Sequence, residues 1–294
     1  MPDCPPRRLQ NGFCIFSGGN KALSNKERAD VALVRRGLAP SREKAQVLIM
    51  SGEVYAGERK ISKSSDHVLL EDNLIVRGTA DRYVSRGAYK LEKAVRVFGT
   101  DLKDHVVMDI GASTGGFTDI CLRNGARAVY SIDVGYGQLD WKLRNDPRVT
   151  VMERVNARYL KPEMFPVLPD TAVMDVSFIS IRLILSAAFE VMGKDGIMIT
   201  LIKPQFEAGR DKIGKNGVVR SSDTHEEVLN GIVQFADSAG LCVNKLDYSP
   251  ITGPEGNIEF LAQIQSKREN DAIIGEEQIH SLVNEAHRKL CHPD

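Results

Sequence analysis

The 294-residue sequence predicts an α/β protein in which a mostly parallel, helix-covered sheet follows a small α+β domain. Two observations carry this prediction. From His105 onward, apolar runs of strand length alternate with helical stretches, which is typical of a parallel sheet covered on both faces. Before residue 77, two short helical stretches lead into short strand-like pieces. The 42% hydrophobic content allows a core of ordinary size, so neither disorder nor a disulfide scaffold is expected.

The composition also limits location and function. The five cysteines are scattered, odd in number and without a C-x-x-C pair, so we expect reduced thiols in a cytoplasmic protein and no zinc or other metal site. The most apolar window, residues 173–192, is broken by Asp175, Arg182 and Glu190 and is too polar for a membrane helix. Residues 1–25 lack the apolar stretch of a signal peptide, and we expect them to form a loose extension.

The neutral net charge hides an uneven distribution along the chain. Residues 1–100 hold 18 Lys and Arg against 11 Asp and Glu, a positive surplus that the remaining residues balance. A basic front end attached to an acidic body suggests that the front end binds a polyanion. Charge alone leaves a merely solvated basic face as the alternative.

The basic front end predicts a small domain of two helices and several strands. Ser24 or Asn25 can cap a first helix that ends at Gly37, and Ser41 can cap a second helix. Short strands follow around a turn at Gly57. The order of elements is therefore two helices and then a small sheet.

The segment RADVALVRRGLAPSREKAQVLIMSGEVYAGERKI, residues 28–61, resembles the small RNA-binding module named after ribosomal small-subunit protein four. The resemblance implies an α+β domain over residues 26–78 that recognises RNA shape through phosphate contacts. The alternative is a basic helical hairpin that binds protein. The side chains expected to contact RNA are Arg28, Arg35, Arg36, Arg42 and Lys44 in this domain, and Arg86 just after a polar linker at residues 79–85.

The larger domain, residues 86–265, carries the alternating pattern. The last two predicted strands follow each other without a helix, so they should pair antiparallel and complete a seven-stranded sheet. In the charged tail, residues 266–294, an apolar stripe predicts one more helix that docks on the body. The predicted strands cover residues 106–110, 128–133, 149–153, 171–176, 196–202, 241–248 and 257–264, and the predicted helices cover residues 116–124, 181–192 and 223–239.

A glycine turn joins the first of these strands to the first of these helices, in the segment VVMDIGASTGGFTDICL at residues 106–122. It places backbone N–H groups and the positive end of a helix at the carboxyl edge of the sheet, where a ligand should bind. Gly111, Gly115 and Gly116 allow a close backbone approach that a Cβ would obstruct. The spacing G-x-x-x-G-G is neither the dinucleotide fingerprint nor a Walker phosphate loop.

Two polar residues beyond this turn indicate what the ligand is. Asp133 ends the second strand, where its carboxylate can accept hydrogen bonds from both hydroxyls of a ribose, with a plain turn aspartate as the alternative. Asn156 follows the third strand at a place suited to an adenine contact, although such an Asn is often only a turn former. With the glycine turn, they resemble the S-adenosylmethionine site of class I methyltransferases, whose fold is a Rossmann-like, seven-stranded, mostly parallel sheet. The resemblance implies S-adenosylmethionine as the cofactor, held by Asp109, Gly111, Ser113, Gly115, Gly116, Phe117, Asp133, Val134, Asn156 and Asp175.

Four charged residues lie in segments that should meet at the same edge of the sheet. Asp175, Lys203 and Glu259 stand at strand ends among apolar residues, and Lys90 precedes the first strand. Any one of them could be a surface charge, but lone buried charges are costly unless paired, so three in such surroundings are poorly explained as surface. Methyl transfer to a ribose 2′-hydroxyl requires groups of this kind, because that oxygen holds its proton far above neutral pH and a base must be brought to it.

The chain resembles the TlyA family in six segments: SRGAYKLEKA, DIGASTGGFTD, DVGYGQLDWKLRNDPRV, DVSFIS, KPQFEAGR and ITGPEGNIEF. These bacterial ribosomal RNA 2′-O-methyltransferases of the FtsJ type were first described as hemolysins. The resemblance covers residues 27 to about 265 and implies a catalytic tetrad of Lys90, Asp175, Lys203 and Glu259. Within this tetrad we expect Lys203 to act as the general base toward the 2′-hydroxyl. We therefore expect methylation of a ribose in 16S or 23S ribosomal RNA, or in both, at a cytidine or another nucleotide. The partners implied are ribosomal subunits, and the expected state is a monomer or weak oligomer.

Three other functions compete with this hypothesis. A pore-forming hemolysin would need a segment suited to a bilayer, which the sequence lacks. A non-catalytic RNA-binding or ribosome-assembly factor would not need all four charged residues together with the glycine turn. A base methyltransferase would carry an Asn/Asp-Pro-Pro-Tyr type site where this sequence has Asp175-Val176-Ser177-Phe178.

Overall fold

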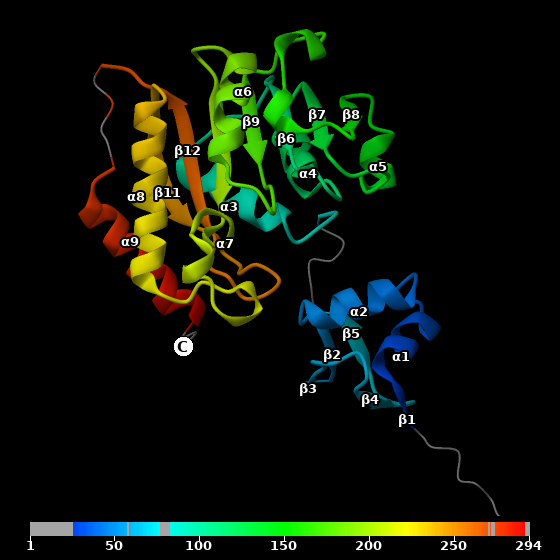
Figure 1. Ribbon diagram of the computed structural model, residues 1–294. Helices are drawn as coiled ribbons and strands as arrows, with labels where there is room; N and C mark the ends of the chain where they lie inside the picture. The colour runs from blue at the N-terminus through cyan, green and yellow to red at the C-terminus, as the bar shows by residue number, and fades with distance from the viewer. Residues whose placement is uncertain (1–25, 58, 77–82, 270, 272–273, 292–294) are drawn as a thin grey trace, which may run out of the picture. The chain divides into compact units, whose positions relative to one another are not determined.

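The computed structural model describes residues 26–57, 59–76, 83–269, 271 and 274–291 (Figure 1). The predicted N-terminal extension and residues 79–82 of the predicted linker lie outside these ranges. The chain divides into two compact units, Met1–Gly78 and Thr79–Asp294. Each unit has hydrophobic core clusters of its own.

The first unit contains two helices and two small sheets. α1 (Ala29–Arg35) ends before Gly37, whose φ is +70°, and α2 (Arg42–Met50) begins after Ser41, whose Oγ accepts the backbone N–H of Lys44 at 3.3 Å. The sequence predicts both helices but not the strand β1 that precedes α1. Because of this strand, α1 begins at Ala29, later than the predicted cap at Ser24 or Asn25 would allow. Both of these residues lie outside the described ranges. The sheets pair β1 (Lys26–Arg28) with β4 (His67–Leu69), and β2 (Val54–Ala56) with β3 (Arg59–Lys60) and β5 (Leu74–Val76).

The second unit is built on a seven-stranded sheet of order β11-β12-β10-β9-β6-β7-β8. Neighbouring strands run parallel except at β12, which pairs antiparallel with both β10 and β11. This confirms the predicted architecture, although β12 begins three residues later than predicted because residues 257–259 lie in the loop before it. The strands are β6 (Val106–Ile110), β7 (Ala128–Asp133), β8 (Val149–Glu153), β9 (Thr171–Met174), β10 (Ile197–Ile202), β11 (Leu241–Tyr248) and β12 (Phe260–Ser266).

Helices cover both faces of this sheet, because apolar side chains alternate along the strands. In β6, Val106, Met108 and Ile110 belong to the core under α6, α8 and α9, whereas Val107 belongs to the core under α3, α4 and α5. The helix that carries Lys90, α3, was not expected from the sequence. The helices are α3 (Ala88–Phe98), α4 (Gly116–Arg123), α5 (Trp141–Arg144), α6 (Arg182–Met192), α7 (Pro204–Glu207), α8 (Ser222–Ser238) and α9 (Glu276–Cys291).

The C-terminal helix α9 docks on the body as the sequence predicts. It lies along α8 and β11, and its side chains Ile279, Val283 and Ala286 are fully buried (Figure 1). In the part of the chain that the structure describes, no helix has the length and apolar character needed to cross a membrane.

Candidate active site

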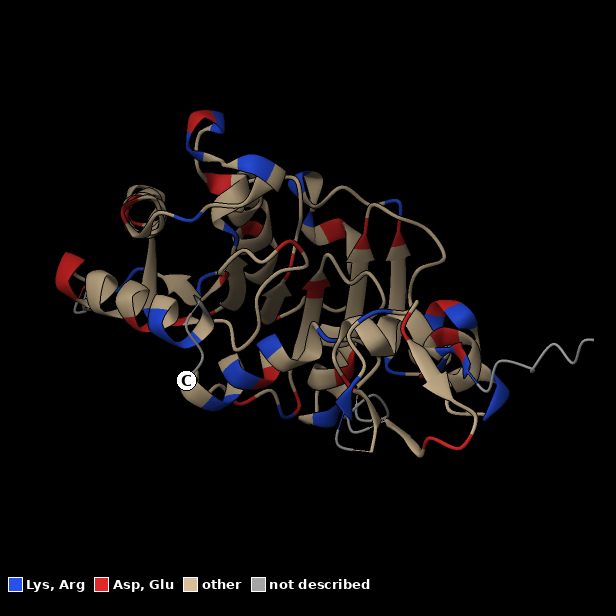
Figure 2. Cartoon of the chain, turned by 90° about the horizontal axis from the view of Figure 1, so that it is seen from below, with Lys and Arg blue, Asp and Glu red and all other residues tan. Residues whose placement is uncertain are grey.

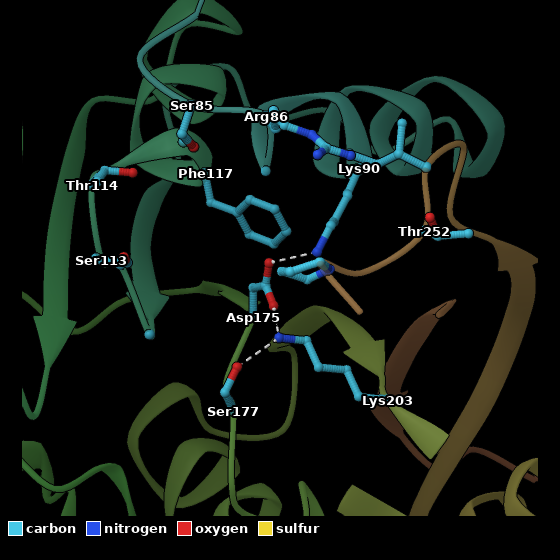
Figure 3. A pocket seen from close by; sticks show the side chains of 16 residues that line it. Ser85, Arg86, Lys90, Ser113, Thr114, Phe117, Asp175, Ser177, Lys203 and Thr252 are labelled. Atoms are coloured by element: carbon cyan, nitrogen blue, oxygen red, sulfur yellow. Dashed lines mark hydrogen bonds and ion pairs between the residues drawn. The ribbon is translucent and has the colours of Figure 1, made fainter. Parts of the chain in front are cut away.

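Two adjoining cavities open at the carboxyl ends of the parallel strands. The smaller has a volume of about 260 Å³ and lies between the glycine turn, the start of α3 and the ends of β9 and β10 (Figure 3). The larger has a volume of about 1120 Å³ and extends along the ends of β7 and β8. Both are lined by Gly111, Ser113, Asp175 and Ser177. The structure therefore has cavities at the edge of the sheet where the sequence predicts a ligand site.

The glycine turn allows segments of the protein itself to approach closely. Gly111 has a φ of +85°, and a Cβ there would lie 2.7 Å from the backbone oxygen of Asp175. A Cβ on Gly115 would collide with Leu143 of α5, and one on Gly116 would collide with the Ser85 hydroxyl. The missing side chains of these glycines thus allow neighbouring segments of the protein, and not only a ligand, to pack closely against the turn.

Asp133 is fixed beside this turn by two backbone hydrogen bonds. Its Oδ2 accepts the N–H of Ser113 at 2.9 Å, and its Oδ1 accepts the N–H of Gly135 at 2.7 Å. Each oxygen keeps acceptor capacity for one more donor. A carboxylate held in this way at the wall of the larger cavity fits a ligand with two adjacent hydroxyls.

The remaining predicted cofactor contacts differ in how they are placed. Phe117 lines the smaller cavity, and the exposed Val134 lines the larger one. Asn156 lines the larger cavity too, but its Oδ1 accepts the N–H of Arg158 at 3.1 Å and so also forms the turn after β8. The position of Asn156 is therefore compatible with both expectations, an adenine contact and a turn former.

Asp109 lies beneath the cavities rather than on their walls. It is completely buried, and its Oδ2 accepts the hydroxyl of Thr118 at 2.6 Å, which also bonds the Ser131 hydroxyl at 2.8 Å. Burial raises the pKa of the Asp109 carboxyl to about 7. Asp109 lines neither cavity, so its predicted contact with the cofactor stays a prediction.

The structure brings the four predicted charged residues into one cluster. Lys90 Nζ lies 2.7 Å from Glu259 Oε2 and 3.3 Å from Asp175 Oδ2. Lys203 Nζ lies 2.5 Å from Asp175 Oδ1, and it donates to Ser177 Oγ at 3.0 Å (Figure 3). The four come from different elements: α3, the loop after β9, the residue after β10 and the residue before β12.

The charges in this cluster support one another. Burial opposes the charged form of Lys90, but the neighbouring carboxylates of Asp175 and Glu259 outweigh it and raise the pKa of Lys90. Burial likewise opposes the charge of Asp175, but the two lysines outweigh it and lower the pKa of Asp175. The charged forms of Lys90 and Asp175 are therefore both favoured within this nearly buried cluster. Among the described residues, no group of three or more His, Cys, Asp or Glu side chains could hold a metal ion.

Three further residues in the segments after β9 and β10 are not among the predicted site residues. Ser177 bonds Lys203, and Phe178 stands 91% exposed with a φ of +64°. Glu207 is buried at the end of α7, where its carboxylate accepts the Ser180 hydroxyl and the Ile181 N–H, both at 2.7 Å. Glu207 thereby ties the loop after β9 to the segment after β10. All three residues lie in the quoted motifs DVSFIS and KPQFEAGR, but no local pattern reveals the exposure of Phe178.

In the first unit, the predicted RNA contacts are partly engaged with acidic side chains. Arg28 and Arg42 both bind the buried Asp30, at 3.0 Å each, and hydrogen bonds from these groups lower the pKa of Asp30. Arg35 binds Glu27 at 2.6 Å but remains exposed, as does Lys44. The exposed basic residues Arg28, Arg35, Arg42 and Lys44 thus lie on α1 and α2 or directly before α1.

Two residues predicted to contact RNA, Arg36 and Arg86, are not among these exposed basic residues of the first unit. Arg36 is only 20% exposed and donates to the backbone carbonyls of Leu69, Leu70 and Asp72, so much of its hydrogen-bonding capacity holds the fold together. Arg86 belongs to the second unit, where it lines the smaller cavity (Figure 3).

Comparison with known proteins agrees with this arrangement. The FtsJ-like methyltransferase family matches residues 83–265, and the S4 domain matches residues 27–74. A Bacillus subtilis protein provisionally named rRNA methyltransferase YqxC is 47% identical over 270 residues, which cover 91% of this chain and 96% of that protein. The 16S/23S rRNA (cytidine-2′-O)-methyltransferase TlyA of Mycobacterium tuberculosis is 39% identical over 266 residues, which cover 90% of this chain and 99% of that protein.

A solved structure shows the same likeness. A Streptococcus thermophilus protein provisionally described as a hemolysin superimposes with a TM-score of 0.72 at 45% identity, covering 90% of this chain and 97% of that one. From the two domain matches and these relatives, the chain belongs to the TlyA family of FtsJ-like methyltransferases.

Proposed function

We propose that this protein methylates a ribose 2′-hydroxyl of ribosomal RNA with S-adenosylmethionine as the methyl donor. The observation that carries the proposal is the cluster of Lys90, Asp175, Lys203 and Glu259 beside the cavity of the glycine turn. A poor nucleophile such as a ribose hydroxyl requires a positioned proton acceptor, and this cluster offers one at the cavity wall. The relatives named as ribosomal RNA 2′-O-methyltransferases support the same reaction.

The residues around the two cavities fit S-adenosylmethionine. Asp133 suits the two hydroxyls of its ribose, and Asn156 and Val134 line the space for its adenine. Gly111, Ser113 and Asp175 line both cavities, so they lie where the methionine part would pass. When bound, S-adenosylmethionine supplies a methyl group activated by a sulfonium centre.

Among the four charged residues, we assign the proton acceptance to Lys203. Lys90 contacts two carboxylates, which raise its pKa and keep it charged. The lowered pKa of Asp175 keeps this group ionised, and its oxygens are already shared between two lysines. Lys203 contacts one carboxylate and one hydroxyl and lines the cavity, so it is the group free to turn toward a substrate oxygen.

The other three members would position Lys203 and the substrate rather than exchange protons. Asp175 orients Lys203 through the 2.5 Å ion pair, and Glu259 holds Lys90 at 2.7 Å. Holding a nucleophile in line with the atom it attacks contributes much of the rate of such reactions. Lys203 can accept a proton only as a neutral amine, so its own proton must leave before or during RNA binding.

The RNA substrate class follows from the relatives and from the basic first unit. We propose that Arg28, Arg35, Arg42 and Lys44 contact phosphates, with Arg86 acting at the cavity itself. A ribosomal substrate places the protein in the cytoplasm. The nucleotide is proposed to be a cytidine, as the names of the Mycobacterium tuberculosis and Campylobacter jejuni relatives state for those enzymes.

The direct test is methyl transfer from radiolabelled S-adenosylmethionine to unmodified ribosomal subunits, followed by nuclease mapping of 2′-O-methylation. Label in 16S or 23S ribosomal RNA at a 2′-oxygen is expected. RNA binding without any transfer would instead favour a ribosome-assembly factor, and label on a base would overturn the ribose assignment.

Lys203→Arg tests the role of the proposed base. A guanidinium keeps the positive charge but cannot accept a proton at working pH, so we expect single-turnover methylation to fall at least a hundredfold between pH 6.5 and 9.5. The dissociation constants for S-adenosylmethionine and RNA should stay within a few-fold of wild type. Lys194→Arg, on an exposed lysine, is the matched control. A near-normal rate for Lys203→Arg would show that this residue is a positive clamp and that solvent takes the proton.

A further inference from the structure

A second concentration of positive charge lies in the methyltransferase unit, between α7 and α8. We call residues 209–220 the basic strap. It contains Arg210, Lys212, Lys215 and Arg220 against a single acidic residue, Asp211. All five of these side chains belong to exposed residues. Only Arg210, the last residue of the motif KPQFEAGR, belongs to one of the family motifs.

The strap is fastened at one end to the loop that carries Glu259. Asn257, only 3% exposed, accepts the backbone N–H of Val219 through Oδ1 and donates to the backbone oxygen of Gly217 through Nδ2, each at 3.0 Å. Val219 and its neighbour Val218 are buried. Because Asn257 precedes Glu259 by two residues, this end of the strap is held beside the charged cluster.

The other end of the strap lies at the rim of the larger cavity. Arg210 and Ile213 line that cavity together with Phe178 and Phe206, whose rings are 5.2 Å apart. The strap therefore runs from the cavity rim to the loop of Glu259. This path follows the edge of the sheet at which both cavities open.

Most of the strap's positive charge is not neutralised by the protein. Lys212 is paired with Glu227 of α8. By contrast, no carboxylate of the described residues lies within 4.0 Å of the side-chain nitrogens of Arg210, Lys215 or Arg220. Elsewhere on this unit, segments with Lys and Arg are interspersed with segments with Asp and Glu (Figure 2). A local surplus of positive charge in the basic strap therefore attracts the RNA backbone to this edge of the sheet.

We propose that the basic strap binds the RNA backbone next to the target ribose, with Lys215 and Arg220 contacting phosphates and Asn257 acting as the positioning residue that holds the strap at the active site. This inference rests on the proposed function. It gives the methyltransferase unit its own phosphate contacts, in addition to those of the S4 domain. Flanking phosphates held there would fix the register of the strand, while the cavity receives the ribose.

The test uses the full-length protein with the double substitution Lys215→Ala and Arg220→Ala. Binding to 16S and 23S ribosomal RNA is measured by filter retention from 50 to 300 mM KCl. Loss of two phosphate contacts should weaken binding about tenfold at 100 mM KCl and reduce the slope of log K against log salt by about 1.5, at roughly 0.7–0.9 per phosphate. S-adenosylmethionine affinity, measured by calorimetry, should stay within twofold.

The matched control is Lys103→Ala with Arg127→Ala, which removes two exposed cations from the opposite edge of the sheet. The control should bind RNA with the wild-type slope. An unchanged slope for the strap variant, or an equal loss in the control, would overturn the proposal. This experiment measures RNA binding and not methyl transfer. If the wild type transfers no methyl group, the proposed function fails, but the binding measurements still test the role of the basic strap.

The substitution Asn257→Ala tests whether the position of the basic strap matters for RNA binding independently of its positive charge. It keeps every cation but removes both hydrogen bonds that hold the strap, so we expect several-fold weaker RNA binding with S-adenosylmethionine affinity within twofold. Asn257→Asp keeps the acceptor for the Val219 N–H and should restore part of the RNA affinity. RNA binding at wild-type strength in Asn257→Ala would remove Asn257 from the proposal.

Discussion

Replacing Asp109 by Asn should change how the stability of the methyltransferase unit depends on pH. Burial raises the pKa of the Asp109 carboxyl from 3.8 to about 7, although hydrogen bonds from Thr118 oppose the rise. The charges of Asp175 and Asp133 act in the same direction as burial. The folded state therefore binds this proton more tightly than the unfolded chain does. It follows that the free energy of unfolding falls as the pH rises from about 4 through 7.

The size of the effect follows from the shift. A difference of about 3 pKa units corresponds to about 4 kcal/mol, of which about 2–3 kcal/mol is lost between pH 5 and pH 8. Asn is nearly the same size as Asp, can accept the Thr118 hydroxyl and has no charge to bury. The stabilities of the wild type and Asp109→Asn should thus diverge by about 2–3 kcal/mol over this interval, with the variant gaining as the pH rises.

Urea unfolding followed by circular dichroism at pH 5, 6, 7 and 8 measures this divergence. Hydrogen exchange of the β6 amides checks that the transition belongs to the unit containing Asp109. Asp195→Asn is the control, because the Asp195 side chain is fully exposed and its removal should leave the pH dependence parallel to that of the wild type. If the curves of Asp109→Asn and the wild type are parallel as well, the carboxyl is ionised at no cost and the reasoning is refuted.

Two further predictions concern the two ligands. Asp133→Ala should weaken S-adenosylmethionine binding at least tenfold without changing RNA affinity, because the ribose hydroxyls lose charge-assisted partners at roughly 1.5–3 kcal/mol per bond; calorimetry that finds unchanged affinity would move the ribose elsewhere. Removal of residues 1–77 should weaken RNA binding and flatten its salt dependence while sparing S-adenosylmethionine binding, because the S4 domain and its phosphate contacts are lost. A truncated chain with the full-length salt slope would show that this domain is not an RNA anchor.

The sequence predicts the sheet of this protein well because buried parallel strands are apolar on both faces. The runs at β6, β7 and β8 coincide with the observed strands residue for residue. The meeting of Asp175 with Lys203 follows from the same rule, since carboxyl ends of parallel strands share one edge. The antiparallel pairing of β12 follows from the missing helix between it and β11.

What the sequence does not predict depends on contacts between distant segments. The burial of Asp109 beneath the turn depends on Thr118 and Ser131 in other elements. The inward bonds of Arg36 depend on carbonyls more than thirty residues away, so composition alone counts it as a free surface charge. Phe178 is exposed and has a positive φ, which is uncommon for a residue with a Cβ, and no local pattern indicates either property.

The order of contacts in the charged cluster explains why its members differ. The ion pairs form a chain, Glu259 to Lys90 to Asp175 to Lys203, so the two inner groups each have two partners and the two outer groups have one ionic partner each. Neutralising an inner group, Lys90 or Asp175, would leave two charged partners without their counter-charge. This costs more free energy than neutralising an outer group, Glu259 or Lys203, which has one charged partner. Of the two outer groups, Glu259 is buried behind Lys90 and lines neither cavity, whereas Lys203 lines the smaller one. Lys203 is thus the one of the two that a substrate entering the cavity can reach, which is why we propose it as the proton acceptor.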